Sequence, residues 1–331
     1  MTHKGRVAAV LSRQPIDRPP VSLWGHDFLS EWSASDLASQ TIERQAAYDY
    51  DLVKVTPRWT IFPEAWGNRY KPPVEQKYPR LLSRVVKCAA DLKDLPVVES
   101  AHPAFSEHVE AMQMVVSEIG DDVDCVATLF SPLAVLGLVA GGVGHPLIHM
   151  AQEEPRATHK ALENITETLA AHARALLHAG ASGIFFSPLQ WTSLSVCPPQ
   201  VYEEFADPYD RALLTAISDA RLNMLHICGD EVDLERFFDY PVEILNWDSF
   251  SENNPGLVEV AQRSGKIVAG GIPHTRLEEL GEEALLALVR DAIDGLDSGF
   301  ILTGGCVIDP STPPLSRAAV VTVADALAVR G

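Results

Sequence analysis

The chain has 331 residues, of which 47% are hydrophobic and 21% charged, a composition that supports a large buried core and argues against a disordered chain. Its formal net charge of −19 at pH 7 disfavours nucleic acid and anionic membrane surfaces as partners, because both would repel it. The sequence contains no apolar run of the roughly 18 to 20 residues that a membrane-spanning helix needs. The N-terminal segment also lacks the apolar core of a signal peptide, so we expect a cytoplasmic protein.

Apolar runs of strand length alternate with amphipathic segments of helix length along the whole chain. The predicted strands are residues 21–25, 52–56, 125–130, 183–187, 223–227, 243–247, 267–271 and 300–303. Helical segments include residues 156–180, 199–220, 257–265, 282–296 and 314–329. Most of the strands are continuously hydrophobic, as expected for parallel strands that are covered on both faces.

Residues 66–94 interrupt this alternation and predict a small hairpin or loop excursion after the second strand. The sequence contains no internal repeat, low-complexity tract or flexible linker. Length alone would permit two domains, but eight strand–helix units fit one closed barrel. The pattern therefore predicts a single (β/α)8 TIM barrel, an α/β fold, over residues 1–331.

Three metal-binding residue types stand at the ends of two predicted strands. His226 and Cys228 are two residues apart in the fifth strand and therefore point to the same face of an extended chain. Cys306 follows the eighth strand, after Gly304 and Gly305, which let the backbone come close to whatever it binds. Active sites of TIM barrels lie at the carboxyl ends of the strands. One imidazole and two thiolates with an open position are typical of a catalytic zinc site.

Such a thiolate-rich zinc favours activation of a thiol substrate over activation of water, which indicates group transfer to a thiol. The alternative is that the three residues are ordinary interior residues, since free cysteine is among the most buried residue types. Five cysteines with wide spacing predict reduced thiols rather than disulfides. Cys88, Cys125 and Cys197 lie away from the carboxyl ends of the strands and are interpreted as structural.

At these residues the sequence resembles the uroporphyrinogen decarboxylase superfamily, and within it the zinc-dependent methyltransferases that act on methylated corrinoid proteins. The resemblance covers nearly the whole chain. It lies in RVAAVLSRQPIDRPPVSLWG, FFSPLQWTSLSVCPPQVYEEFADPYDRALL, LHICGD and LTGGCVIDPSTPPLSRAAVV. It implies that His226, Cys228 and Cys306 are zinc ligands. A similar His-x-Cys and distal Cys site belongs to the more distant cobalamin-independent methionine synthases.

Two departures from the decarboxylases of the superfamily bear on function. Their arginine-rich segment after the first strand is replaced here by WGHDFLS, which cannot neutralise a porphyrinogen with many carboxylates. Their essential aspartate after the second strand is replaced by TPRW, residues 56–59. Decarboxylation of a porphyrinogen is therefore disfavoured.

Further polar residues follow the other strands and are candidates to face the pocket. We expect His26, Arg58 and Asp248 to be catalytic, and Arg58, Ser187 and His274 to bind substrate. Arg58 is the best candidate to grip a carboxylate or sulfonate, because its guanidinium forms two parallel hydrogen bonds.

Each of these residues also has a structural interpretation. His26 could cap the segment that follows it, and Arg58 could pair with Glu64. Asp248 could ligate zinc in the absence of substrate, hold the ring of His226, or cap a helix. Glu64 and Gln190 receive no role.

The first functional hypothesis is a methyltransferase that uses Zn²⁺ to activate a thiol, or a similar acceptor such as a folate, against a methylated corrinoid. The chain contains no corrinoid-carrying segment, so the cobalamin donor would be free or carried by a partner protein. The second hypothesis is a metal-independent lyase acting on a smaller carboxylic acid, with His26 and Arg58 as an ionic pair. A degenerate barrel retained as a binding subunit is a third, and a homodimer remains open.

Overall fold

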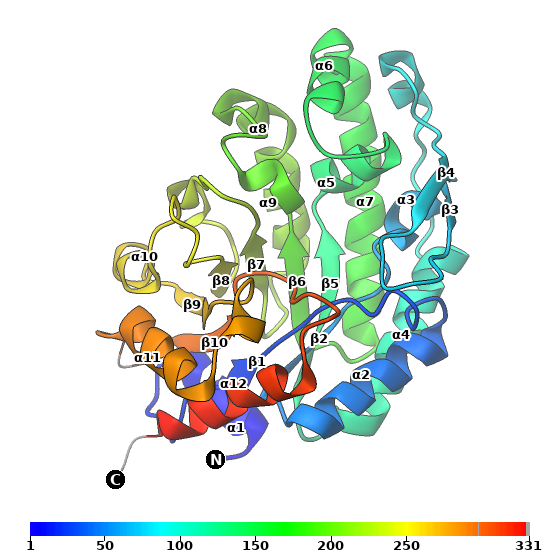
Figure 1. The fold of residues 1–331 in the computed structure, drawn as a ribbon. Coiled ribbons are helices and arrows are strands. Elements are labelled where there is room, and N and C mark those ends of the chain that lie inside the picture. Colours follow the sequence, from blue (N-terminus) through cyan, green and yellow to red (C-terminus); the bar gives the residue numbers. More distant parts are fainter. Residues whose placement is uncertain (297, 329–331) are drawn as a thin grey trace.

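The computed structural model describes residues 1–296 and 298–328 and confirms the predicted (β/α)8 barrel (Figure 1). Parallel strands form an 8-stranded sheet in the order β1-β10-β9-β8-β7-β6-β5-β2. Their bounds are β1 Val21–Ser22, β2 Leu52–Val55, β5 Asp124–Phe130, β6 Gly183–Ser187, β7 Met224–Ile227, β8 Ile244–Trp247, β9 Ile267–Ile272 and β10 Phe300–Gly304. The two outermost strands of this order meet where Asp51 N donates to Val21 O at 2.8 Å and Ser22 Oγ donates to Leu52 O at 2.5 Å. The barrel is therefore nearly closed.

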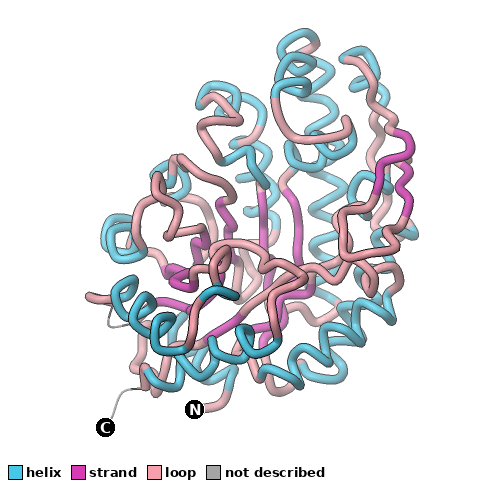
Figure 2. The backbone as a smooth tube through the Cα atoms, viewed as in Figure 1, coloured by secondary structure: helices cyan, strands magenta, loops and turns pink. Residues whose placement is uncertain are grey.

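Helices lie around the barrel strands, which occupy the interior of the molecule (Figure 2). Their bounds are α1 His3–Leu11, α2 Ala34–Tyr48, α3 Ile61–Ala65, α4 Pro103–Ile119, α5 Pro132–Val139, α6 His145–Glu153, α7 Pro155–His178, α8 Pro199–Phe205, α9 Asp207–Ala216, α10 Leu257–Ser264, α11 Glu282–Ile293 and α12 Pro314–Ala326. Among the described residues, no helix combines the length and the apolar character needed to cross a membrane.

The single helix predicted over residues 199–220 is wrong, because the structure has α8 and α9 in its place. Pro208 explains the break. It lacks the N–H that a continuous helix would use, and its ring would clash with the carbonyl of residue 204. The helix predicted over residues 314–329 ends at Ala326, and Val329 lies outside the described residues.

The excursion after the second strand is the predicted hairpin. β3 (Arg69–Lys71) and β4 (Arg80–Ser83) pair antiparallel in a separate 2-stranded sheet. The hairpin follows β2, so it extends the rim at the carboxyl ends of the barrel strands (Figure 1). Tyr78, in the turn between its strands, lines the cavity described below.

Inward-facing side chains fill the barrel in layers. The layers nearest the amino ends of the strands form a separate apolar cluster inside the barrel. This cluster includes Leu52, Val126, Met224, Ile244 and Ile301. A larger cluster packs between the outside of the sheet and the helices. Because side chains alternate along a strand, the next inward residues towards the carboxyl ends form the floor and walls of the site.

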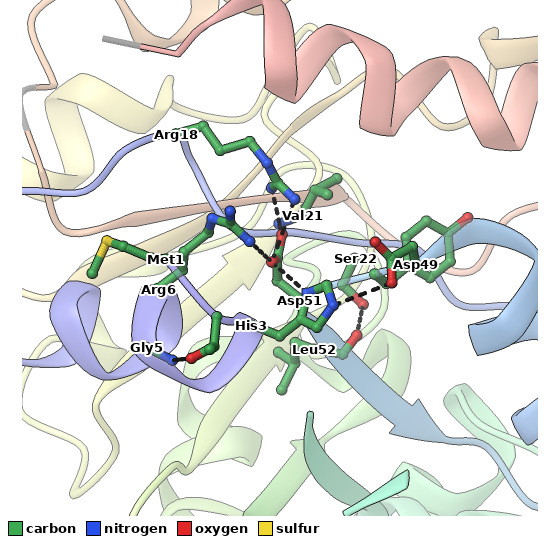
Figure 3. Close-up of polar contacts among 12 residues, drawn as sticks. Met1, His3, Gly5, Arg6, Arg18, Val21, Ser22, Asp49, Asp51 and Leu52 are labelled. Atoms are coloured by element: carbon green, nitrogen blue, oxygen red, sulfur yellow. Dashed lines mark hydrogen bonds and ion pairs between the residues drawn. The ribbon is translucent and has the colours of Figure 1, made fainter. Parts of the chain in front are cut away.

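Asp51, which is fully buried, joins the start of the chain to the barrel (Figure 3). Its carboxylate accepts hydrogen bonds from Arg6 Nη1 at 3.0 Å, Arg18 Nη1 at 2.5 Å and Val21 N at 2.9 Å. His3 Nδ1 lies 2.9 Å from the same carboxylate. Asp51 directly precedes β2. Its side chain therefore holds α1 and the start of β1 in place beside β2.

We expect Asp51→Asn to lower the free energy of unfolding by about 3 kcal/mol, because it removes the buried counter-charge that Arg6 and Arg18 share and leaves them only the more exposed carboxylates of Asp17 and Asp325. Urea unfolding measures this difference. Asp49→Asn is the matched control: Asp49 is 77% exposed and pairs with His3, so its loss should cost no more than about 0.5 kcal/mol. Equal stability of the two variants would contradict a structural role for Asp51.

Candidate metal centre

The structure brings His226, Cys228 and Cys306 together at the carboxyl ends of β7 and β10. One ligand atom of each residue lies within 4.8 Å of the other two. Cys306 Sγ and His226 Nε2 are 3.5 Å apart. Tetrahedral zinc, with bonds of about 2.3 Å to sulfur and about 2.0 Å to nitrogen, sets such a pair of donors about 3.5 Å apart. The donor set and its spacing therefore fit zinc.

Asn246, on β8, determines how the imidazole of His226 is oriented. The side-chain amide of Asn246 donates to Ala269 O at 3.0 Å and to Gly304 O at 3.1 Å, so its oxygen must face the ring. That oxygen lies 2.6 Å from His226 Nδ1, which is therefore the protonated nitrogen. The lone pair of Nε2 is left to face Cys306, as a metal ligand requires.

The two thiols are partly buried and electrostatically linked. A hydrogen bond from Cys228, together with the nearby His226, lowers the pKa of Cys306 well below its usual value. The same hydrogen bond raises the pKa of Cys228 well above its usual value, so the pair favours one thiolate, the form that binds a metal, at Cys306. Phe185 stacks on the ring of His226 with centroids 5.3 Å apart and covers the cluster from inside the barrel.

The glycines before Cys306 have a different purpose from the one expected. A Cβ atom on Gly305 would lie 2.3 Å from the Cα of Asp248. The absence of a side chain therefore lets the chain after β10 pass closely over the end of β8. This close approach carries Cys306 toward His226, and the glycine contacts the protein backbone rather than a ligand.

The cluster opens into a cavity of about 510 Å³ at the mouth of the barrel. Apolar and aromatic residues such as Trp24, Trp59 and Phe185 make up much of its wall. Two of the predicted residues, His26 and Ser187, line the same cavity. Ser187 Oγ accepts a hydrogen bond from Leu189 N at 3.2 Å, which leaves its own proton free to donate.

His26 is held by a residue that the sequence interpretation missed. Its Nδ1 lies 2.8 Å from the carboxylate of Glu31, which is only 1% exposed, and its ring stacks on Phe28. His26 therefore does not act as a cap, as one interpretation of the sequence suggested, but pairs with Glu31. A histidine paired to a buried carboxylate can accept a proton at its other nitrogen.

Arg58 forms salt bridges with two carboxylates instead of facing the cavity. It contacts Glu64, and its Nε and Nη2 donate to Glu107 at 3.1 and 3.0 Å. Among the described residues that line the cavity, Arg58 does not appear. The salt bridge with Glu64 is thus the interpretation that the geometry supports, and Arg58 and His26 form no ionic pair with each other.

Asp248 lies beside the cluster but outside the group of three ligand atoms. Its Oδ1 accepts a hydrogen bond from Phe250 N at 3.1 Å, so it caps the turn after β8. The expectation that Asp248 holds the ring of His226 is wrong, because Asn246 occupies that position. His274 is buried 4.0 Å from Asp248 and lines a neighbouring cavity of about 560 Å³ that shares His26.

Lys54 is the second residue of the site that the sequence interpretation missed. It lies on β2, is 6% exposed and lines the cavity together with His226, Cys228 and Cys306. A signal for it existed, because a lysine interrupts an otherwise apolar strand at residues 52–56. Residues two apart in a strand face the same side, and Leu52 faces the barrel interior. The sequence could therefore have placed the side chain of Lys54 inside the barrel as well.

The remaining cysteines agree with a structural interpretation. All five thiols are free, with Cys88 exposed and Cys125 and Cys197 buried. Burial raises the pKa of both buried thiols to about 12, so they stay protonated and are poor ligands.

Comparisons with known proteins agree with the fold. The family model described as uroporphyrinogen decarboxylase (URO-D) matches residues 2–327. A methyltransferase from Methanosarcina mazei is similar, with a TM-score of 0.81 and 20% identity over 98% of this chain and 99% of that chain. A B12-independent methionine synthase from Shewanella sp. W3-18-1 has a TM-score of 0.61 and 13% identity over 94% and 97% of the two chains. No curated protein sequence matches significantly. At these identities the two structures bear on the fold alone.

We expect the purified protein to contain about one zinc ion per chain, and Cys228→Ser or Cys306→Ser to lose it while the barrel stays folded. Serine is a much weaker zinc ligand than a thiolate, and both side chains lie at the rim rather than in the core. Elemental analysis and far-UV circular dichroism measure the two effects. Cys88→Ser, at an exposed cysteine, is the control. Full zinc occupancy in either ligand variant would show that the three-ligand site is wrong.

Asn246→Ala should weaken zinc binding by about 10- to 100-fold, because the imidazole loses the acceptor that fixes its tautomer. Competition with a chelating dye measures the affinity. Thr303→Val is the matched control, since Thr303 contacts the Asn246 amide at 3.1 Å but not the ring. Equal zinc affinity in the Asn246 variant and the wild type would remove Asn246 from the metal centre.

Proposed function

This chain belongs to the uroporphyrinogen decarboxylase family, and we propose that it is a zinc-dependent methyltransferase that moves a methyl group from a methylated corrinoid to a thiol. The observation that carries the proposal is the position of His226, Cys228 and Cys306 on the wall of the barrel cavity. These three residues would hold the ion and leave one position for the substrate.

Zinc bound by two thiolates and one imidazole would lower the pKa of a substrate thiol and keep it as the nucleophilic thiolate. Other residues of the chain orient the ligands and exclude water. Asn246 fixes the orientation of His226. Phe185 and Trp24 pack edge to face beside the cluster and make the cavity apolar, so that water competes poorly with the thiol.

The proposed transfer breaks two bonds and forms two. The acceptor loses its S–H proton, and its sulfur attacks the methyl carbon of the corrinoid. The carbon–cobalt bond of this donor substrate would break with both electrons staying on cobalt, which would go from Co(III) to Co(I). The proton passes to Nε2 of His26, since Nδ1 already contacts Glu31. The buried carboxylate of Glu31 then stabilises the imidazolium.

The corrinoid would reach the site from outside the chain. We propose that a partner protein, or free methylcobalamin, presents the methyl group at the barrel mouth. The open cavity at that end is consistent with a large donor. The proposal is consistent with the reactions of two proteins that share this fold, a methyltransferase and a methionine synthase.

The metal-independent lyase fits the geometry less well. It needs His26 and Arg58 as an ionic pair, whereas His26 contacts Glu31 and Arg58 contacts Glu64 and Glu107. A porphyrinogen substrate fits poorly too, since Lys54 is the one Lys or Arg among the described residues that line the cavity. A single ammonium group cannot neutralise many carboxylates.

The zinc-loaded protein should consume methylcobalamin when it is mixed anaerobically with an accepting thiol or folate. The change in the absorption spectrum from methylcobalamin to cob(I)alamin measures the reaction, and mass spectrometry of the acceptor identifies the methylated product. Cys306→Ser should abolish the reaction, and Cys88→Ser should leave it intact. An unchanged spectrum with every thiol and folate in the panel would contradict the proposal.

A further inference from the structure

Lys54 is a buried ammonium group without a carboxylate partner among the described residues. Its Nζ donates to Thr56 Oγ1 at 3.0 Å and lies 4.5 Å from the centroid of the Phe185 ring. Within the described part of the chain, no Asp or Glu oxygen lies within salt-bridge distance of it. Other buried cations of this protein are paired, as Arg18 is with Asp51 and Arg58 is with Glu107.

This arrangement is costly, because an ammonium group loses its hydration inside the barrel and gains only a hydroxyl and an aromatic face in return. Burial lowers the pKa of Lys54 from 10.5 to about 7, against smaller opposing effects of Cys306 and Glu31. A methionine or leucine would fill the same space at no such cost. A residue that is unfavourable for stability, in a cavity that holds a metal-binding cluster, indicates a functional site.

The walls of the cavity suit an anion. Among the described residues that line it, none is Asp or Glu. The hydroxyl of Thr128 donates to Val55 O at 2.7 Å, so its proton is already used. Ser187 Oγ accepts from Leu189 N, and its proton remains free for a ligand. The cavity therefore offers a cation from β2 and a hydroxyl donor from β6.

These donors are separate from the metal-binding cluster but share its cavity. Lys54 lies on β2, and His226 lies on β7, with β5 and β6 between them in the sheet. Phe185 lies between these two residues, with its ring centroid 4.5 Å from Lys54 Nζ and 5.3 Å from the ring centroid of His226, so one small molecule in the cavity of about 510 Å³ could contact both Lys54 and the cluster. The site thus has two points of attachment for one ligand.

We propose that Lys54 is the anion-binding residue of the cavity, and that it selects acceptor thiols that also carry a carboxylate, a sulfonate or a similar anionic group. The anion would pair with Nζ and accept a hydrogen bond from Ser187, while the thiol faces His226, Cys228 and Cys306. This inference rests on the proposed function. It gives Lys54 the role that the sequence suggested for Arg58.

The experiment compares thiols of one length on the zinc-loaded protein by isothermal titration calorimetry, without any corrinoid. The probes are 3-mercaptopropionate, the corresponding sulfonate, and the neutral 3-mercaptopropanol. Lys54→Met should weaken binding of the two anionic thiols by about 10- to 100-fold, the range expected for loss of a hydrogen-bonded ion pair. It should change binding of the neutral thiol by less than about 3-fold. The carboxylate and sulfonate arms identify which anion the site prefers.

Three controls sharpen the result. Lys160→Met removes a charge from the exposed face of α7 and should leave all three affinities unchanged. Lys54→Gln serves as a second neutral variant if Lys54→Met does not fold. The zinc content of each variant must match that of the wild type, because a lysine that merely balanced the cysteine thiolates would alter zinc binding instead.

Equal weakening of the neutral and anionic thiols, or no weakening at all, would overturn the proposal. The outcome is independent of methyl transfer. A wild type that binds anionic thiols through Lys54 but leaves methylcobalamin unchanged would contradict the proposed function and leave the anion site standing. Methyl transfer that depends neither on Lys54 nor on the charge of the acceptor would contradict the anion site and leave the proposed function standing.

Discussion

Closure of the parallel sheet is the constraint on which the candidate site depends. All the barrel strands run in one direction, so their carboxyl ends meet at one rim. His226 on β7 and Cys306 after β10 are three strands apart in the order of the sheet, which is about 14 Å on a flat sheet with strands about 4.8 Å apart. In the barrel their Nε2 and Sγ atoms are 3.5 Å apart. Curvature of the sheet, together with the loop through Gly305, creates the cluster.

Polar groups inside the barrel fall into two kinds. The amide of Asn246 and the carboxylate of Glu31 each fix one nitrogen of a histidine and leave the other available. Their hydrogen bonds satisfy the polar atoms that the fold buries, so these groups contribute order at little cost. Lys54 is different, since its ammonium group donates to a hydroxyl and lies over an aromatic ring, with no carboxylate of the described residues within salt-bridge distance. Asn246 and Glu31 orient the side chains of the site, whereas the unpaired charge of Lys54 indicates a bound anion.

The sequence predicted much of this architecture because the signals for it are local. Continuous apolar runs mark strands that are covered on both faces, and all the predicted barrel strands are present. The spacing of His226 and Cys228 fixes their common face without knowledge of any neighbour. Where a local signal was overlooked, the prediction failed: Pro208 ends α8 before α9 begins, and Lys54 interrupts an apolar strand.

Partners across the fold could not be predicted from the sequence. Arg58 has Glu64 nearby in the chain, but its second carboxylate, Glu107, comes from α4. Asn246 takes the place beside His226 that Asp248 was expected to fill, because residue 246 faces inward in register with His226 and residue 248 lies beyond the strand. The sequence by itself determined the barrel and the three candidate metal ligands at its strand ends, since strand periodicity and chain order encode them. Only the tertiary structure decided which charges are paired and which are left for a ligand, because hydrogen bonds and salt bridges join residues that strand order and curvature bring together.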